Sequence, residues 1–456
     1  MHRVTKRTWL IHVFLLILLL GMGFFLWEYM TEAQTWVAAA GSPHLYNNSN
    51  IGCGTLVDRS GTVLLDISSS RSYAEDKTTR KSTLHWLGDR LGYISAPAVA
   101  GYAEEMSGYG LLNGLYGYSG TGGEAVLTIS AEVQKVALEA LGKKKGTVAV
   151  YNYKTGEILC AVTTPTYDPD NVPDIDEDSE KYEGIYLNRF TQVSYVPGSV
   201  FKIVTAAAAL DSLENAAELQ FRCRGSYDMD GGRVKCSGEH GKIDLEQALR
   251  KSCNCYFAQL TEVLGADVLT QYVEKFRITE PVRFDGVTTS KGHFSVEGAA
   301  DQEIAWAGIG QHLDTVNPCR YMTFLGAIAG GGEAAEPYIV SYAGAGFLGT
   351  HRASKTTTGR IMDKQTAVAI TALLRSNVEN GYGDDNFPGL TVCAKTGTAE
   401  VGGGKEPNAV FTGFCTDRAY PLAFMVVVED AGSGAKTGIP IASKVLAACK
   451  DLLDSE

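Results

Sequence analysis

A serine stands three residues before a lysine in the segment YVPGSVFKIVTAAAAL, residues 195–210. Apolar residues recur at helical spacing after the Pro-Gly pair, so we expect a helix that Ser199 opens, with Lys202 nearby on the same face. A lysine that has lost its proton can activate a serine hydroxyl, and burial favours the neutral amine. The pair is therefore a candidate nucleophile and base, although the pattern alone is more typical of a capping serine followed by a surface lysine.

A second candidate element is Ser252-Cys253-Asn254 in LRKSCNCYFAQL, the only S-x-N in the chain. A second hydroxyl and an amide could pass a proton and hold a substrate peptide. The alternative is another serine that caps a helix. Together with Ser199 and Lys202, this element makes the catalytic interpretation the stronger one.

The third element is residues 395–398, Lys-Thr-Gly-Thr, at the end of an expected strand TVCAKTGTAE. A cation and hydroxyls could hold a carboxylate there, and Gly397 would let a ligand backbone lie close to the strand. The alternative is a strand end with a solvated lysine. Residues 433–438, SGAKTG, contain the same letters, but we reject them as a site because one lysine would serve both motifs and a Gly-rich loop is expected to form neither a helix nor a strand.

The segments around these motifs predict a mixture of helices and strands. AVLTISAEVQKVALEALGKK predicts a strand followed by an amphipathic helix, with Ser130 as its N-cap and Gly142 as its stop. TVAVYNYKTGEILCAVTT predicts two strands around a turn at residues 154–156, and PLAFMVVVED predicts another strand. Strand pairs joined by tight turns favour antiparallel pairing, so the expected class is α+β.

The N-terminus predicts a membrane anchor. The basic residues Arg3, Lys6 and Arg7 precede an apolar stretch over residues 8–27 that is broken only by His12. About 20 apolar residues span a bilayer, and a basic flank stays on the cytoplasmic side. The alternative is a cleaved signal with a small-residue site at residues 38–40. Beyond the anchor, CGTLVDRSGTVLLD predicts two strands in a small membrane-proximal module, which ends at a Gly-rich joint over residues 120–124.

Composition excludes some functions and partners. A net charge of −12 over 456 residues argues against nucleic acid as the main partner. The spacing of the ten cysteines predicts neither a disulfide framework nor a zinc site, and the chain has no metal or nucleotide motif, so no metal and no cofactor is expected. Cys223 and Cys236 flank an expected hairpin and are either bridged or two reduced, partly buried thiols.

With serine-x-x-lysine, serine-x-asparagine and lysine-threonine-glycine in this order, the chain resembles the penicillin-binding proteins and serine β-lactamases. Over residues 126–456 it is similar to class B penicillin-binding proteins in VLTISAEVQKVALEAL, VAVYNYKTGEILCAVTTPTYDP, HGKIDLEQALRKSCNCYF, AGIGQHLDTVNPCRYM and KTGTAEVGGG. The resemblance implies a transpeptidase and β-lactamase-like fold, with an antiparallel sheet flanked by helices. The expected parts are a cytoplasmic tail (1–7), a transmembrane anchor (8–28), a membrane-proximal module (29–125) and a transpeptidase domain (126–456).

The resemblance also implies a peptidoglycan D,D-transpeptidase on the outer side of the cell membrane. Ser199 would be acylated by the penultimate D-alanine of a stem peptide, the terminal D-alanine would leave, and an amine of a neighbouring stem would take the acyl group. Lys202 would be the base, Ser252 would relay the proton, and Asn254 would hold the substrate amide. The D-alanine carboxylate would be bound by Lys395, Thr396 and Thr398, with Gly397 permitting its approach, and the backbone N–H groups of Ser199 and Thr398 would form the oxyanion hole.

The resemblance further implies acylation by β-lactam antibiotics. The module of residues 29–125 is too short for a glycosyltransferase domain, so a polytopic membrane glycosyltransferase is the expected partner. Gly310-Gln311-His312 stands where the family often has Gly-Gln-Gly, and Cys53-Gly54 where it often has Arg-Gly, which leaves the loops there open. The alternatives are a D,D-carboxypeptidase or β-lactamase-like hydrolase with water as acceptor, a β-lactam sensor, and a scaffold that activates the glycosyltransferase.

Overall fold

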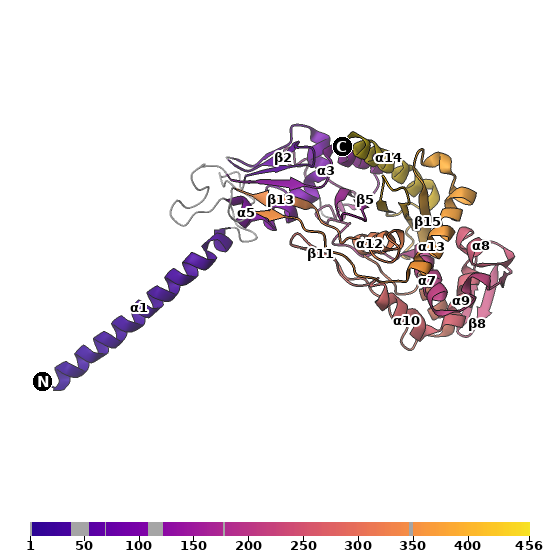
Figure 1. The fold of residues 1–456 in the computed structure, drawn as a ribbon, viewed down its shortest axis with the longest axis horizontal. Helices are drawn as coiled ribbons and strands as arrows, with labels where there is room; N and C mark the ends of the chain where they lie inside the picture. The colour runs from indigo at the N-terminus through magenta and orange to yellow at the C-terminus, as the bar shows by residue number, and fades with distance from the viewer. Residues whose placement is uncertain (1, 38–53, 69, 108–121, 177, 346–349) are drawn as a thin grey trace.

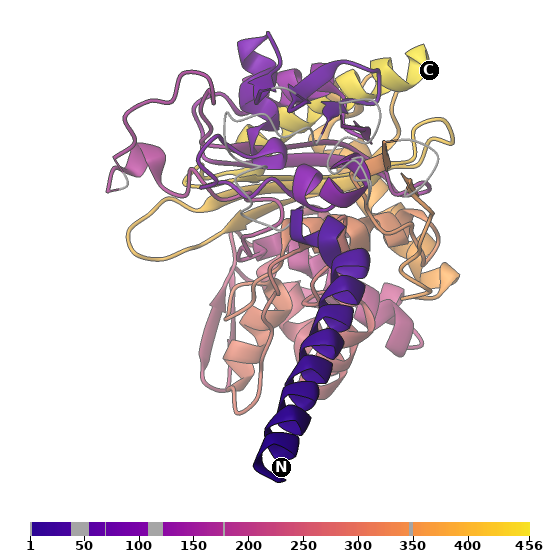
Figure 2. The same cartoon turned by 90° about the vertical axis from the view of Figure 1, so that its left-hand side faces the viewer.

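The computed structural model describes residues 2–37, 54–68, 70–107, 122–176, 178–345 and 350–456. Residues 38–40, Cys53 and the first part of the Gly-rich joint lie outside the described residues. The chain begins with helix α1 (His2–Val37), which extends away from the rest of the chain (Figures 1 and 2). Within the described residues, only its segment Arg7–Glu32 is long and apolar enough to cross a membrane, and none of its most apolar window is buried. This agrees with the expected anchor.

A five-stranded antiparallel sheet forms the centre of the larger part of the molecule. Its order is β15 (Val392–Ala399), β16 (Asn408–Cys415), β17 (Leu422–Val428), β5 (Gly146–Asn152) and β6 (Ile158–Thr164). Every residue of β5, β6, β16 and β17 is buried, because helices cover both faces of the sheet. The expected antiparallel α+β arrangement is confirmed, and β15, which carries the Lys-Thr-Gly-Thr motif, is the edge strand next to β16.

Helices α6 (Ala131–Leu141) and α14 (Gly434–Ser455) share one hydrophobic cluster with one face of this sheet. As expected, the Ser130 side chain accepts a hydrogen bond from the N–H of Val133 and caps α6, and Gly142 ends the helix. On the other face lies α12 (Pro318–Ala329), whose residues are buried from Pro318 to Ile328. A helix that is apolar all round has to be enclosed on every side, and α12 lies between the sheet and the helices that carry the candidate site.

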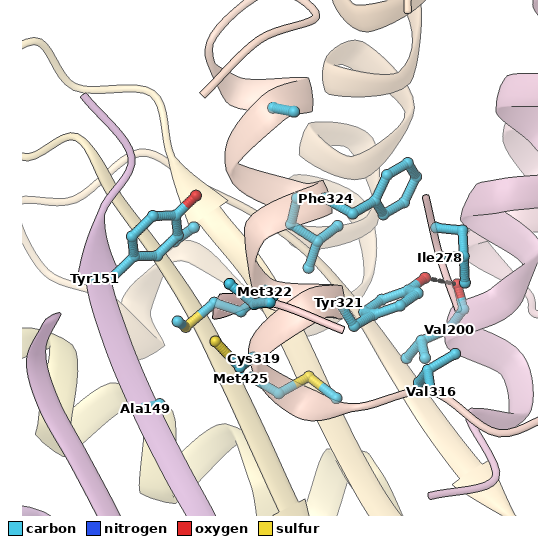
Figure 3. Packing of buried hydrophobic residues seen from close by; sticks show 14 of the residues in the cluster. Ala149, Tyr151, Val200, Ile278, Val316, Cys319, Tyr321, Met322, Phe324 and Met425 are labelled. Carbon is cyan, nitrogen blue, oxygen red and sulfur yellow. Dashed lines mark hydrogen bonds between the residues drawn. The ribbon is translucent and has the colours of Figure 1, made fainter. Parts of the chain in front are cut away.

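Figure 3 shows this packing around α12. Met425 of β17 lies close to Cys319 and Met322 of α12 in the same cluster. Tyr321 on α12 is fully buried and donates a hydrogen bond of 2.7 Å to the carbonyl of Val200. A residue of the buried core therefore contacts the turn that contains Ser199 directly.

A second, six-stranded sheet lies nearer α1. Its order is β14 (His351–Arg352), β13 (Val340–Gly344), β4 (Glu124–Leu127), β1 (Thr55–Val57), β2 (Val63–Asp66) and β3 (Ser72–Tyr73). The two strands expected from CGTLVDRSGTVLLD are β1 and β2, and residues 59–61 lie in the turn between them. Two strands from residues 340–352 complete the sheet, and β4 spans the expected boundary at residues 125 and 126. The division into domains stays a prediction, and the two regions share this sheet.

The remaining elements pack against the two sheets and around the candidate site. The helices are α3 (Lys77–Leu87), α4 (Pro97–Ala100), α5 (Ala103–Ser107), α7 (Lys202–Ser212), α8 (Leu245–Arg250), α9 (Asn254–Leu264), α10 (Ala266–Lys275), α11 (Asp301–Ile309) and α13 (Lys364–Asn377). The short strands pair as β7 (Phe221–Cys223) with β10 (Gly241–Ile243), β8 (Ser226–Met229) with β9 (Gly232–Lys235), and β11 (Arg283–Phe284) with β12 (Val287–Thr288). The hairpin expected between Cys223 and Cys236 is confirmed as β8–β9, and both cysteines are free thiols.

Candidate active site

Ser199 lies in a short 3₁₀ turn, η2 (Gly198–Phe201), that leads into α7. Ser199 precedes α7 instead of opening it, because α7 begins at Lys202, and the alternative of a capping serine is wrong because no side chain caps the turn. The turn is fixed by tertiary contacts instead: the N–H of Gly198 donates to the carbonyl of Gly310 at 2.9 Å. Since the Ser199 hydroxyl does not cap, it is available to Lys202.

The Lys202 Nζ atom is fully buried and lies among four oxygen atoms. They are Ser199 Oγ at 3.0 Å, the Ser252 carbonyl at 2.8 Å, Ser252 Oγ at 3.2 Å and Asn254 Oδ1 at 2.7 Å. The carbonyl and the amide oxygen can only accept hydrogen bonds. In a neutral amine they take both N–H hydrogens, and the remaining lone pair can then accept a proton only from a hydroxyl. The geometry therefore suits a lysine base beside Ser199.

Electrostatics also favour the neutral amine of Lys202. Burial lowers the pKa of Lys202 to about 7, against smaller opposing effects of Cys236, Cys253 and Cys255. No carboxylate is among the hydrogen-bond partners that the described residues give to its Nζ. Near neutral pH a large fraction of Lys202 is therefore deprotonated, as a general base requires.

Ser252 and Asn254 lie at the start of α9. Ser252 has a positive φ of 52°, and the cap of α9 is Cys253, whose Sγ accepts from the N–H of Tyr256. This backbone turn aims both the carbonyl and the hydroxyl of Ser252 at Lys202. The Asn254 side chain is held from the other side, because its Nδ2 donates to the carbonyl of Lys235 at 2.9 Å.

Lys395 is fully buried in the middle of β15, which excludes a solvated lysine, and the motif runs from it to Thr398, one residue before the strand ends, as expected. Its Nζ donates to Ser252 Oγ at 3.1 Å and to the Thr396 carbonyl at 2.8 Å. Burial first, and the charge of Lys202 second, lower the pKa of Lys395 well below its ordinary value. Ser252 Oγ thus bridges two lysines, and a proton can move along this path.

The other three residues of the Lys-Thr-Gly-Thr motif lie in different surroundings. The Thr396 hydroxyl is hydrogen-bonded to Tyr382 Oη at 3.0 Å, whereas Thr398 lines the same cleft as Ser199. A Cβ on Gly397 would lie 3.1 Å from the carbonyl of Pro197 and 3.1 Å from Val200. The turn with Ser199 therefore lies closely against Gly397, and the approach of a ligand backbone to this residue stays a prediction.

Substitution of Gly198 tests how closely the turn η2, which contains Ser199, must lie against β15. Its φ is +57°, and a Cβ there would lie 2.7 Å from the Thr398 carbonyl. We expect Gly198→Ala to push the turn from the strand and slow acylation by penicillin about 10–100-fold, equivalent to ~1–3 kcal/mol. The matched control is Gly359→Ala, which has a φ of +65° but open space around its Cβ. Acylation by Gly198→Ala at the unchanged rate would show that this contact is not needed.

A cleft of about 670 Å³ contains the candidate residues Ser199, Ser252, Asn254 and Thr398. Five further residues line it that the sequence interpretation did not single out as site residues: Ser237, Trp306, Ile309, Gln311 and Glu400. For Gln311 a signal was present, since it lies in the Gly-Gln-His segment; its Oε1 accepts from the N–H of Glu400 at 3.3 Å. Glu400 lies two residues after the Lys-Thr-Gly-Thr motif, just beyond the end of β15.

The rejected segment at residues 433–438 does start a helix, contrary to expectation. Ser433 caps α14 and accepts a hydrogen bond from the N–H of Lys436, and Lys436 is exposed. The rejection still follows from the structure, because the Ser433 hydroxyl bonds to a backbone N–H and the cleft is lined by other residues.

Asp314, three residues after Gln311, is fully buried. Burial raises its pKa to about 8, against a smaller opposing effect of the His312 backbone. In the unfolded chain the carboxyl releases its proton near pH 3.9, so between about pH 4 and 8 the folded state binds more protons and stability falls as pH rises. We expect the fall in melting temperature between pH 5 and 8 to be smaller in Asp314→Asn than in the wild type, by ~2 °C or more. An unchanged pH dependence, equal to that of the exposed-site control Asp451→Asn, would contradict this.

Comparison with known proteins agrees with the site geometry. Residues 146–448 match the penicillin binding protein transpeptidase domain. The chain is 27% identical over 403 residues to the peptidoglycan D,D-transpeptidase PbpA of Mycobacterium tuberculosis, covering 80% of each chain. It is 30% identical over 341 residues to stage V sporulation protein D of Bacillus subtilis, covering 70% of this chain and 52% of that protein.

Solved structures show the same fold. The ceftriaxone acyl-enzyme complex of penicillin-binding protein A from M. tuberculosis superimposes with a TM-score of 0.75 at 23% identity, covering 89% of this chain and 99% of that one. The D,D-transpeptidase domain of a peptidoglycan glycosyltransferase from Eggerthella lenta gives a TM-score of 0.73 at 24% identity, covering 88% and 98%. The family match extends over about two thirds of the chain and includes all three motifs around Lys202. The chain therefore belongs to the penicillin-binding protein transpeptidase family, and within it to the class B penicillin-binding proteins.

Proposed function

We propose that this chain is a membrane-anchored serine D,D-transpeptidase that cross-links peptidoglycan stem peptides through an acyl-enzyme on Ser199. The observation that carries the proposal is the arrangement around Lys202 Nζ, where two pure acceptors occupy the amine hydrogens and the Ser199 hydroxyl lies 3.0 Å away. The anchor is α1, and the domain after it lies on the outer side of the membrane. The basic residues before the apolar segment support this orientation.

In the first step, Ser199 Oγ attacks the carbonyl carbon of the penultimate D-alanine, and its proton passes to Lys202 Nζ. The backbone N–H groups of Ser199 and Thr398 stabilise the oxyanion; both residues line the cleft, and β15 is an edge strand. The C–N bond then breaks, and the proton returns through Ser252 Oγ to the nitrogen of the leaving D-alanine. Ser252 suits the relay because its Oγ lies 3.2 Å from Lys202 Nζ and 3.1 Å from Lys395 Nζ.

In the second step, an amine of a neighbouring stem peptide attacks the acyl-enzyme. The amine loses a proton to Lys202, the peptide bond forms, and Ser199 leaves and is protonated again. The Asn254 amide, fixed between Lys202 and the Lys235 carbonyl, holds the donor peptide. Lys395, whose Nζ is buried, acts on the substrate carboxylate through Ser252 Oγ, while the exposed Thr398 hydroxyl contacts the carboxylate directly.

The test uses the full chain in detergent, labelled with a fluorescent penicillin and digested for mass spectrometry. We expect one penicilloyl group on the peptide that contains Ser199. In a separate reaction, unlabelled chain is given a lipid-linked stem-peptide substrate together with a separate glycosyltransferase, and released D-alanine and cross-linked dimers are measured. Labelling at another residue would overturn the site. Hydrolysis of penicillin at catalytic rates would favour a β-lactamase, and D-alanine release without dimers would favour a carboxypeptidase.

We also propose that glycan polymerisation is carried out by a polytopic membrane glycosyltransferase that contacts the membrane-proximal six-stranded sheet. The support is position, since this sheet lies nearer α1 than the five-stranded sheet does (Figure 1). If the chain were only a scaffold, the Ser199→Ala protein would still support cross-linking and growth in cells.

A further inference from the structure

Three cysteines and a histidine from three separate segments converge beside the candidate active site. Cys223 ends β7, Cys236 follows β9, His240 precedes β10, and Cys253 precedes α9. Their sulfur and nitrogen atoms all lie within 4.8 Å of one another. The spacing, C-x₁₂-C-x₃-H-x₁₂-C, differs from common zinc motifs. For this reason the sequence interpretation expected no metal site.

The distances within this cluster match the edges of a zinc tetrahedron. With Zn–S near 2.3 Å and Zn–N near 2.0–2.1 Å, tetrahedral angles place two sulfur ligands about 3.8 Å apart and a sulfur and a nitrogen about 3.6 Å apart. Cys236 Sγ lies 3.8 Å from Cys253 Sγ. His240 Nδ1 lies 3.6 Å from Cys223 Sγ and 3.6 Å from Cys236 Sγ. Three measured edges therefore have the lengths that one central ion requires.

The chemistry and burial of the four groups also suit a structural zinc site. Three thiolates and one imidazole are a common closed donor set for Zn²⁺, whereas Ca²⁺ and Mg²⁺ prefer oxygen ligands. Cys223 and Cys253 are buried and the other two groups are partly buried, which limits access of water. The S–S separation of 3.8 Å is far longer than the ~2.05 Å of a disulfide bond.

We propose that Cys223, Cys236, His240 and Cys253 bind one Zn²⁺ ion in a structural tetrahedral site. Binding removes three thiol protons, which pass to solvent, and leaves the imidazole neutral with Nδ1 on the metal. No electron is transferred, and all four positions of the tetrahedron are filled by the protein, so the ion takes no part in the reaction at Ser199.

The role of such an ion follows from the position of Cys253 between Ser252 and Asn254. An ion on Cys253 and Cys236 would tie the start of α9 to the end of the β8–β9 hairpin. The same two segments meet where Asn254 Nδ2 donates to the carbonyl of Lys235, the residue before Cys236. The metal site would thus hold the three oxygen atoms that Ser252 and Asn254 direct at Lys202 Nζ.

The experiment measures metal in the full chain, purified in detergent without a metal-affinity tag. We expect about one zinc per chain by elemental mass spectrometry. Replacement by Co²⁺ should give the thiolate charge-transfer and strong visible bands of tetrahedral sulfur coordination. Cys223→Ser and His240→Ala should each lower bound metal at least ~10-fold after dialysis against a weak chelator, since each removes one of four ligands.

Two buried cysteines away from the cluster provide controls, Cys160 on β6 and Cys449 on α14. Cys160→Ser and Cys449→Ser should keep one metal per chain. The proposal is overturned by a wild-type chain without metal, by a Co²⁺ spectrum without thiolate bands, by a Cys223–Cys236 disulfide in the purified protein, or by loss of metal in Cys160→Ser. Labelling by fluorescent penicillin is measured in parallel. A chain that lacks metal but is still labelled at Ser199 would contradict the metal site alone and not the proposed function.

Discussion

Ser199→Ala is expected to abolish covalent labelling by penicillin and to lower transpeptidation at least ~10⁴-fold, because the residue that forms the acyl-enzyme is lost. The fold should be kept: the Ser199 side chain caps no helix, so its removal costs little stability. The measurement is fluorescent penicillin labelling and dimer formation, with thermal unfolding as the check on folding. A labelled Ser199→Ala protein would mean that another residue is the nucleophile.

The rejected segment at residues 433–438 provides the matched control. Ser433 also precedes a lysine by three residues, but its Oγ accepts from the backbone N–H of Lys436 and caps α14. Ser433→Ala should therefore lower the free energy of unfolding by ~1 kcal/mol while penicillin labelling stays at the wild-type rate. The two variants together separate loss of a cap from loss of a nucleophile.

The sequence was sufficient to predict the elements that depend on local chemistry. Ser130 and Gly142 are the cap and the stop of α6, and the turn at residues 154–156 joins β5 and β6, because caps and tight turns are determined by a few neighbouring residues. The antiparallel sheet followed from strands joined by such turns. The motif residues Ser199 and Ser252 do meet at Lys202, and Lys395 contacts Ser252, which spacing along the chain could only suggest.

Features that depend on tertiary contacts could not be predicted from local patterns. Ser199 does not cap α7, because the Tyr321 hydroxyl and the Gly310 carbonyl hold its turn from other helices. Gly397 faces Val200 across the interface between β15 and η2, a contact between residues about 200 positions apart. Strand β13 pairs with β4 from more than 200 residues away, and the Cys223 cluster is drawn from three segments. Nothing in a local pattern carries information on these distant pairings.

After the nucleophile, the proposed mechanism depends most on which residue acts as the base. Lys202→Met is expected to slow acylation by penicillin ~10³-fold at pH 8, since general-base catalysis contributes about 10²–10⁴. Methionine keeps a straight apolar chain in a fully buried position but cannot accept a proton. Lys436→Met, at the exposed lysine of the rejected segment, should acylate at the wild-type rate.

The pH profile distinguishes a base from a merely structural lysine. Burial lowers the pKa of Lys202 to about 7, so its neutral fraction rises with pH, and the wild-type acylation rate should fall about tenfold per pH unit below pH 6 and level off above pH 8. The residual rate of Lys202→Met should lack this step, because no other hydrogen-bond partner of Ser199 Oγ or Lys202 Nζ among the described residues titrates in that range. A wild-type profile that is flat from pH 5 to 9, or a Lys202→Met profile that keeps the step, would show that the proton of Ser199 goes elsewhere. A step with its midpoint near pH 7 in the wild type that is absent from Lys202→Met would instead show that the burial of this one amine controls the rate of the acylation step.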